Sequence, residues 1–403
     1  MTLHRPGARN TLRRPPKLPR PEPAPRVPVP ALPKNHRTQP WPLISENHDD
    51  AGAGTATVTF LYESRRAKTV LLFVNRLTDE RDITRSEMEY FGDGLWALSY
   101  RMDTDWRASY AFLEHTGCGE PPWRTETDQR TLRTLLDSGR CDPRNQLTCL
   151  NSGGTPFSVV ELPDAPPQPH RIELRHPSLP QSAVIAAEHS VATASGHRRV
   201  WAHPVGRPGA AAPLVLLLDG ETWLTHHRFQ LSLDSARQAG ELPDLWAVFI
   251  SSGARSERWQ YLGHHDGAAR DLPESILPWA QRTLEAGYEP ASTVVTGHSL
   301  GGISALWALA QHPESIGAVL AQSPSVWTDP DGALAAHLQQ TSGRIRLEVG
   351  RQEWAMADQV RELADALGST GAQVEYAEFN GGHDFACWRG GLIEGITALL
   401  APR

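Results

Sequence analysis

The sequence predicts an α/β fold, a mostly parallel sheet with helices on both faces, preceded by a smaller all-β sandwich. After residue 170, apolar strand-like runs such as PLVLLLDG, LWAVFISSG and STVVTG alternate with helical patterns. Continuous apolar strands of this kind are typical of a sheet that is buried on both faces. Before residue 165, the signals are short and β-like, as in TATVTFLYES and AKTVLLFVNRL. Nothing repeats at a fixed period, which excludes a solenoid.

Composition bounds the class of protein. The chain has 403 residues, 39% of them hydrophobic, enough for one large domain or two ordinary ones. It shows neither an apolar run long enough for a membrane span nor a secretory signal, so we expect a cytoplasmic protein. The net charge of −7 argues against a nucleic-acid partner. Four cysteines without metal-ligand spacing fit a reducing compartment, with a Cys141–Cys149 bridge left open, as is the oligomeric state.

Three segments follow from composition shifts along the chain. Residues 1–45 alternate Pro with Arg and Lys, which predicts a disordered or polyproline-II-like tail. Residues 46–168 hold the predicted sandwich and end in a linker rich in Pro, Asn and Gly. Residues 169–403 form the predicted α/β domain.

The segment TVVTGHSLGGISALWAL, residues 293–309, predicts a catalytic centre. A β-branched run, the pentapeptide GHSLG and an apolar helical pattern match the strand, sharp turn and helix of a nucleophile elbow. Gly297 and Gly301 avoid clashes at so tight a turn, which makes Ser299 the expected nucleophile of an α/β-hydrolase. The backbone N–H of Leu300, at the positive end of the helix, can face an oxyanion. The alternative is an ordinary strand-to-helix turn.

The base and the acid of such a site follow the serine in the chain, each after a strand. His383 lies in the Gly-rich loop NGGHDFACW after the last strand and is the expected general base. Glu353, three residues past Gly350 at a strand end, is the preferred acid. A dyad without a strong acid also stays open, and His298 points the wrong way for a base. Other carboxylates considered are Glu348, Asp358 and Asp384.

A second oxyanion donor is expected from the loop LLLDGETWLTHH, through the backbone N–H of Glu221, Thr222 or Trp223. Arginines near the motifs predict a basic rim over the serine, although a surface role is the alternative for each. They are Arg255, Arg258, Arg351 and Arg389. Tryptophans flank the same segments, either as binding faces or as packing residues. They are Trp223, Trp259 and Trp388.

With these motifs the chain resembles the enterochelin (enterobactin) esterases over about residues 50 to 403. The first stretches that carry the resemblance are VTFLYES, GLWALSYRMDTDWRASYAFL and a linker with DPRN and LPDAP. The others are LLLDGETW, ARSERWQYL and LPESILPW, and the pair GHSLGGISAL and GGHDFACWRGGL. The first 45 residues depart from the family pattern, and SSGARSER lacks an expected Asp.

The resemblance implies hydrolysis of a catecholate siderophore, a 2,3-dihydroxybenzoyl-serine trilactone or a related scaffold, as its ferric complex, with iron released inside the cell. It carries Ser299 and His383 over as nucleophile and base and supports Glu353 as acid. No cofactor is expected, since acyl transfer needs only a base and oxyanion stabilisation, and iron would arrive with the substrate. A generic carboxylesterase or acyltransferase, and a siderophore-binding protein without activity, are the alternatives.

Overall fold

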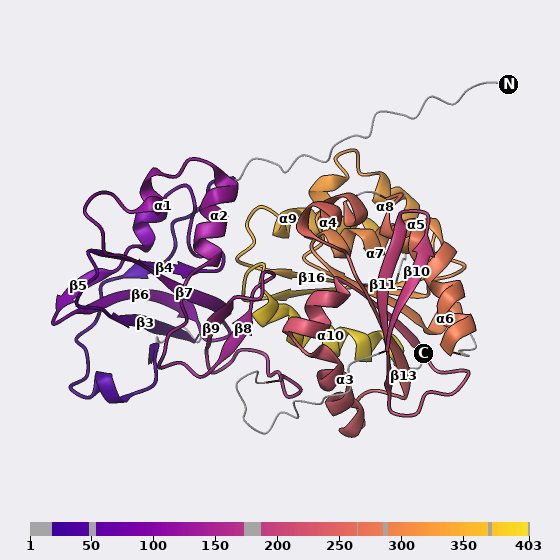
Figure 1. The fold of residues 1–403 in the computed structure, drawn as a ribbon, viewed down its shortest axis with the longest axis horizontal. Coiled ribbons are helices and arrows are strands. Elements are labelled where there is room, and N and C mark those ends of the chain that lie inside the picture. Colours follow the sequence, from indigo (N-terminus) through magenta and orange to yellow (C-terminus); the bar gives the residue numbers. More distant parts are fainter. Residues whose placement is uncertain are drawn as a thin grey trace.

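The computed structural model describes residues 18–47, 54–172, 187–263, 265–284, 289–369 and 373–401. Two parts lie side by side: a sandwich built from the first part of the chain and a larger α/β part (Figure 1). None of the helices within these ranges is both long enough and apolar enough to cross a membrane.

The α/β part is built on an eight-stranded sheet in the order β10-β11-β13-β12-β14-β15-β16-β17. The β10–β11 and β11–β13 pairs are antiparallel, whereas the other neighbours are parallel. The mostly parallel sheet predicted from the sequence is confirmed. The strands are β10 (Ala187–Thr193), β11 (Gly196–Val205), β12 (Leu214–Leu218), β13 (Leu245–Ile250), β14 (Thr293–His298), β15 (Ala318–Gln322), β16 (Arg344–Gly350) and β17 (Gln373–Phe379).

Helices cover both faces of this sheet, because successive side chains of a strand point to opposite sides. Leu216 and Leu218 of β12 enter one core, and Val215 and Leu217 enter the other. On the second face lie α3 (Phe229–Gln238) and α10 (Phe385–Leu400). On the first lie α4 (Arg255–Leu262), α5 (Ala268–Asp271), α6 (Leu277–Leu284), α7 (Leu300–Gln311), α8 (Ala333–Leu338) and α9 (Ala357–Gly368). The short helical turns are η3 (Thr222–His226), η4 (Leu272–Ile276), η5 (Pro290–Ser292) and η6 (Val326–Thr328).

Two antiparallel sheets form the N-terminal sandwich, as predicted. Their inner faces share an aromatic core in which the rings of Phe60 and Tyr110 lie 4.8 Å apart. The first sheet holds β1 (Arg26–Val27), β2 (Leu43–Asn47), β3 (Thr55–Glu63), β5 (Glu89–Gly92) and β6 (Leu95–Asp103). The second holds β4 (Thr69–Val74), β7 (Arg107–His115), β8 (Thr148–Leu150) and β9 (Pro156–Glu161). Short helical elements accompany the sheets: η1 (His36–Thr38), η2 (Ile83–Ser86), α1 (Pro122–Thr125) and α2 (Gln129–Asp137).

Residues 18–45, predicted to be disordered or polyproline-II-like, pack against the sandwich in the structure. β1 pairs with β6, so the segment adds an edge strand to the first sheet, and β2 pairs with β3. Trp41 is only 3% exposed and packs in a cluster with Leu61. One buried tryptophan and edge pairing compensate for the scarcity of backbone donors in a Pro-rich segment. Residues 1–17 lie outside the described residues.

Candidate active site

The elbow predicted at Ser299 is present in the structure. β14 ends at His298, α7 begins at Leu300, and Ser299 between them has φ 55° and ψ −119°. This backbone conformation costs a residue with a side chain about 1–3 kcal/mol, and residues strained in this way are common at functional sites. A Cβ at Gly297 would lie 2.3 Å from the backbone of Gly301, so only glycine fits there. At Gly301 the nearest atoms would be 3.4 Å away, an ordinary contact, so the predicted clash does not hold for that position.

A buried carboxylate holds the expected base. Nδ1 of His383 lies 2.6 Å from Oε2 of Glu353, which sits in the turn after β16. The other carboxylate oxygen, Oε1, accepts hydrogen bonds from Oγ of Ser323 at 2.6 Å and from the Gly350 N–H at 3.0 Å. Every oxygen of a carboxylate that is 1% exposed therefore has a partner. Of the carboxylates considered, Glu353 is the one that contacts His383 in the described structure.

The electrostatics of this pair suit a base. Burial alone would raise the pKa of Glu353, but the interactions with His383, Arg76 and Ser323 leave that pKa below its ordinary value. Burial lowers the pKa of His383, and the Glu353 carboxylate opposes this shift only in part. The imidazole is therefore neutral at neutral pH and can accept a proton.

Two serines that sequence reasoning missed complete the surroundings. Ser323 passes a hydrogen bond from the Trp388 indole, at 3.0 Å, on to Glu353, so Trp388 and Ser323 fix the carboxylate. The Ser299 hydroxyl is 3.3 Å from the hydroxyl of Ser325, and both Ser299 and His383 are partly exposed. The signal was available as SPS, the Ser-rich turn at residues 323–325 directly after β15, which pairs with the elbow strand β14.

The other acid candidates have separate partners. Asp384 caps α10 through the Ala386 N–H and accepts a hydrogen bond from the Ser109 N–H at 2.6 Å. Glu348 pairs with Arg346 inside the sheet, and Asp358 pairs with Arg361 on the surface. None of these three carboxylates is bonded to His383 in the described structure.

His298 is buried beside the nucleophile, as its position in a strand predicts. Its ring packs against Trp223, Phe385 and Trp388, and Nε2 lies 3.4 Å from the Asp219 carboxylate. Burial lowers the pKa of His298 to about 3. A histidine that stays neutral and packed in this way is a structural residue, so His298 is not the base.

Two of the three backbone N–H groups predicted as second oxyanion donors already have partners, and the Glu221 N–H stays the predicted donor. The N–H groups of Thr222 and Trp223 both donate to the carbonyl of Asp219, at 3.0 and 3.2 Å, because the chain turns helical directly after β12. The Trp223 ring is 1% exposed and packs in the core. The Glu221 carboxylate accepts from the Ser252 N–H at 3.0 Å, and burial raises its pKa to about 7. Leu300, the first residue of α7, keeps the N–H that a helix leaves without an internal partner.

Two of the arginines predicted to form a basic rim, Arg258 and Arg351, are paired with carboxylates. Arg258 makes a bidentate ion pair with the buried Asp219, at 2.6 and 2.7 Å, although its charge still helps to lower the pKa of His383. Arg351 pairs with Asp105 of the sandwich. Arg255 lies exposed at the start of α4. Arg258 and Arg351 are paired because a carboxylate from a distant part of the chain lies within reach, which sequence spacing does not reveal.

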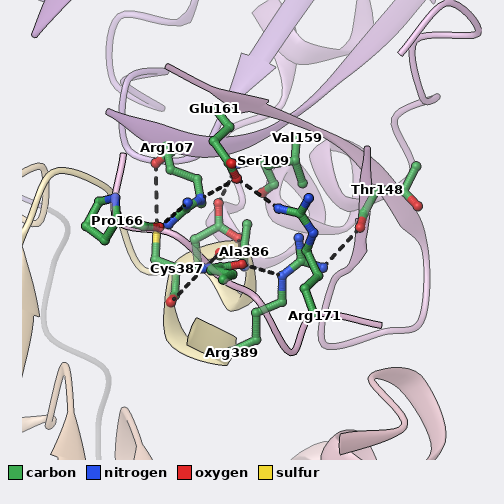
Figure 2. Close-up of polar contacts among 12 residues, drawn as sticks. Arg107, Ser109, Thr148, Val159, Glu161, Pro166, Arg171, Ala386, Cys387 and Arg389 are labelled. Atoms are coloured by element: carbon green, nitrogen blue, oxygen red, sulfur yellow. Dashed lines mark hydrogen bonds and ion pairs between the residues drawn. The ribbon is translucent and has the colours of Figure 1, made fainter. Parts of the chain in front are cut away.

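Arg389 belongs to the contact between the two parts of the molecule. Its Nε donates to the Gln168 side chain at 3.0 Å and its Nη1 to the carbonyl of Thr148 at 3.2 Å. Figure 2 shows these bonds near the start of α10, beside the ion pairs of Arg107 and Arg171 with Glu161. Arg389 therefore serves this contact through Nε and Nη1, and its predicted substrate role stays a prediction.

The sandwich also holds the loop that carries the base. Asn75 donates from Nδ2 to the carbonyl of His383 at 3.0 Å, and the Arg107 N–H donates to the carbonyl of Asn380 at the same distance. The side chain of Arg76 lies against Gly382, where an added Cβ would be 2.6 Å from its Cγ. No motif pointed to Asn75 or Arg76, since they precede His383 by about 300 residues in another part of the fold.

A strained serine at a strand-to-helix elbow, with a hydrogen-bonded glutamate and histidine after later strands of the same parallel sheet, defines a serine hydrolase of the α/β-hydrolase class. The "Putative esterase" family model matches residues 193–399, about half of the chain, and the "Enterochelin esterase, N-terminal" model matches residues 57–171. The chain belongs to the enterochelin esterase family.

Relatives of known name and structure agree. The chain is 28% identical over 387 residues to an iron(III) enterobactin esterase of Dickeya dadantii, covering 86% of this chain and 88% of that one. It is 29% identical over 371 residues to an iron(III) salmochelin esterase of Escherichia coli O6:H1, covering 85% and 87%. The structure of a ferric enterobactin esterase from Salmonella typhimurium superimposes with a TM-score of 0.74 at 27% identity, covering 88% of this chain and 96% of that one. A Shigella flexneri enterobactin esterase, determined in the presence of enterobactin, gives 0.73 at 26%, covering 92% and 99%.

Proposed function

We propose that this protein is a serine esterase that hydrolyses the ester bonds of a catecholate siderophore of the enterobactin type. The observation that carries the proposal is the 2.6 Å bond between Glu353 and His383, in a chain that also has the Ser299 elbow. The names of the relatives, which act on enterobactin and salmochelin, support the substrate class.

The mechanism assigns a role to each group. His383 accepts the hydroxyl proton of Ser299 as the serine oxygen attacks the ester carbonyl, and Glu353 holds Nδ1–H so that Nε2 is the free nitrogen. The N–H of Leu300 stabilises the developing oxyanion. His383 then gives the proton to the departing alkoxide. Water, deprotonated by His383, cleaves the acyl-enzyme and leaves a carboxylic acid and free Ser299.

The proposal also specifies the form of the substrate and the compartment in which iron is released. The ferric complex is taken to be the substrate, so that iron is cargo and the chain needs no resident cofactor. Hydrolysis of the ester backbone turns one hexadentate ligand into separate bidentate ligands. Each of these binds iron more weakly, because the linker no longer holds the other catecholates close to the metal. This would serve iron release in the cytoplasm.

The test is product analysis by chromatography. Wild type and Ser299→Ala are incubated with a ferric catecholate trilactone, its iron-free form and a simple aryl ester. Catecholate cleavage by wild type alone is the expected result, and the ratio of the two forms shows which is preferred. Cleavage of the aryl ester alone would replace the proposal by a generic carboxylesterase. Binding of the catecholate without cleavage would replace it by a sequestering protein.

A further inference from the structure

Arg76 lies between residues adjacent to both members of the catalytic pair. Its side chain contacts Gly382, the residue before His383, and its guanidinium lies 5.7 Å from the ring of Trp354, the residue after Glu353. The residue lies in the turn directly after β4 of the sandwich and has φ 62°, a conformation that costs a non-glycine residue free energy. The fold therefore holds a strained arginine of the sandwich against the two catalytic loops.

This guanidinium interacts with the Glu353 and Glu80 carboxylates only at a distance, without a direct ion pair in the described part of the chain. Within the described ranges, it donates no hydrogen bond and makes no ion pair shorter than 4 Å, although the residue is partly buried. By contrast, a carboxylate or a carbonyl binds three of the four arginines expected near the serine. These three are Arg258, Arg351 and Arg389. A partly buried guanidinium whose donors make no hydrogen bond is costly, and a ligand that supplies negative charge and acceptors removes that cost.

A segment outside both family matches holds Arg76 in place. The carbonyl of Arg76 accepts a hydrogen bond from Nη1 of Arg20 at 2.6 Å, and Nη2 of Arg20 donates to the Gln352 side chain at 2.9 Å. The Arg20 guanidinium also lies 5.5 Å from the Trp354 ring. The connection from residue 20 to the acid loop lies before residue 57, where the N-terminal family model begins.

We propose that Arg76 binds the negatively charged catecholate group of the substrate beside His383, and that Arg20 positions it. The inference rests on the proposed function, because it takes an anionic catecholate ester as the substrate. A guanidinium suits this role, since its planar donors can bond two adjacent oxygens at once. The sandwich would then form part of the substrate site as well as a support for the catalytic loop.

The experiment compares two esters that share the reaction but differ in charge. Wild type, Arg76→Gln and Arg76→Lys are assayed as full-length proteins with ferric enterobactin and with neutral 4-nitrophenyl acetate. The assays are run at a pH where the wild-type rate is pH-independent, because loss of the Arg76 charge also raises the pKa of His383. Melting temperatures check that each variant is folded.

For Arg76→Gln we expect KM for ferric enterobactin to rise by about tenfold to a hundredfold, the usual effect of losing a hydrogen bond to a charged group. The loss of kcat/KM with 4-nitrophenyl acetate should be much smaller than the loss with ferric enterobactin. Arg76→Lys should recover part of the loss, because it keeps the charge but loses the planar pair of donors. Added salt should raise the wild-type KM for the ferric complex more than that of the Gln variant.

Arg20→Gln should raise the same KM by a smaller factor and leave kcat unchanged. Arg26→Gln is the matched control, because Arg26 lies in the same segment but pairs with Glu89 of β5, at the outer end of the sandwich (Figure 1). It should leave both KM values unchanged.

Three results would overturn the assignment. An unchanged KM of Arg76→Gln for ferric enterobactin, with an active wild type, would remove Arg76 from the substrate site and leave the proposed function standing. An equal loss on both esters would show that Arg76 only supports the catalytic loops. A wild type that cleaves the neutral ester but no catecholate would instead overturn the proposed function, and this assignment with it.

Discussion

The α/β part and the sandwich contribute to the same site in different ways. In the α/β part, each expected catalytic residue follows a strand of one mostly parallel sheet. Short motifs around Ser299, Glu353 and His383 are therefore enough to predict a serine hydrolase. In the sandwich, Asn75, Arg76 and Ser109 touch the base loop or its cap with no local motif. Catalytic residues can thus be recognised from short sequence motifs, whereas the residues that hold the catalytic loop come together only in the folded protein.

The largest effect is expected for the nucleophile. Ser299→Ala should lower kcat by about 10⁴–10⁶-fold and leave the affinity for the substrate nearly unchanged, because the hydroxyl acts in the transition state. Single-turnover rates and equilibrium binding measure the two effects. A variant that retains more than a few per cent of the activity would remove Ser299 from the mechanism.

The acid should come next. Glu353→Gln should lower kcat by about 10³–10⁴-fold, since an amide cannot stabilise the imidazolium or hold the required tautomer. Asp358→Asn is the control, because that carboxylate lies on the surface with Arg361, and its activity should equal that of wild type. Comparable losses in the two variants would refute the assignment of Glu353, and a small loss in Glu353→Gln would favour a dyad.

The contribution of the sandwich should be smaller and partly structural. Asp384→Ala removes the cap of α10 and the acceptor of the Ser109 N–H, which should cost about 2 kcal/mol of unfolding free energy and about tenfold in kcat. Asp128→Ala is the matched control, because it removes the cap of α2 within the sandwich. Denaturant unfolding and steady-state kinetics measure both. If Asp128→Ala lost as much activity, the sandwich would act through its overall stability.

The smallest effect concerns the pH dependence of stability. The pKa of His298 is about 3 in the folded protein and near its ordinary value in the unfolded chain. Between these values the unfolded state binds more protons, so the free energy of unfolding falls as the pH is lowered. His298→Gln, which does not titrate, should show a shallower fall between about pH 6 and pH 4 in denaturant titrations. Identical slopes would contradict the neutral, buried state of His298.

The sequence by itself determined the fold class and three positions of the candidate site. The apolar strands of the sheet and the turn GHSLG encode their structure locally, because burial on both faces demands continuous apolar runs and the elbow demands glycine at 297. The spacing of Glu353 and His383 after their strands places them at one edge of the sheet, where the structure joins them by a hydrogen bond. Their catalytic roles stay predictions.

Only the tertiary structure decided which polar groups are free and which are engaged. Arg258 and Arg389 look like ligand-binding residues in the sequence, yet a buried carboxylate and a backbone carbonyl engage them. Trp41 and Arg20 look like parts of a disordered tail, yet the first packs in a core and the second bonds to Arg76. The physical reason is that a charged or aromatic side chain takes whichever partner the fold brings within reach, and that partner can lie hundreds of residues away.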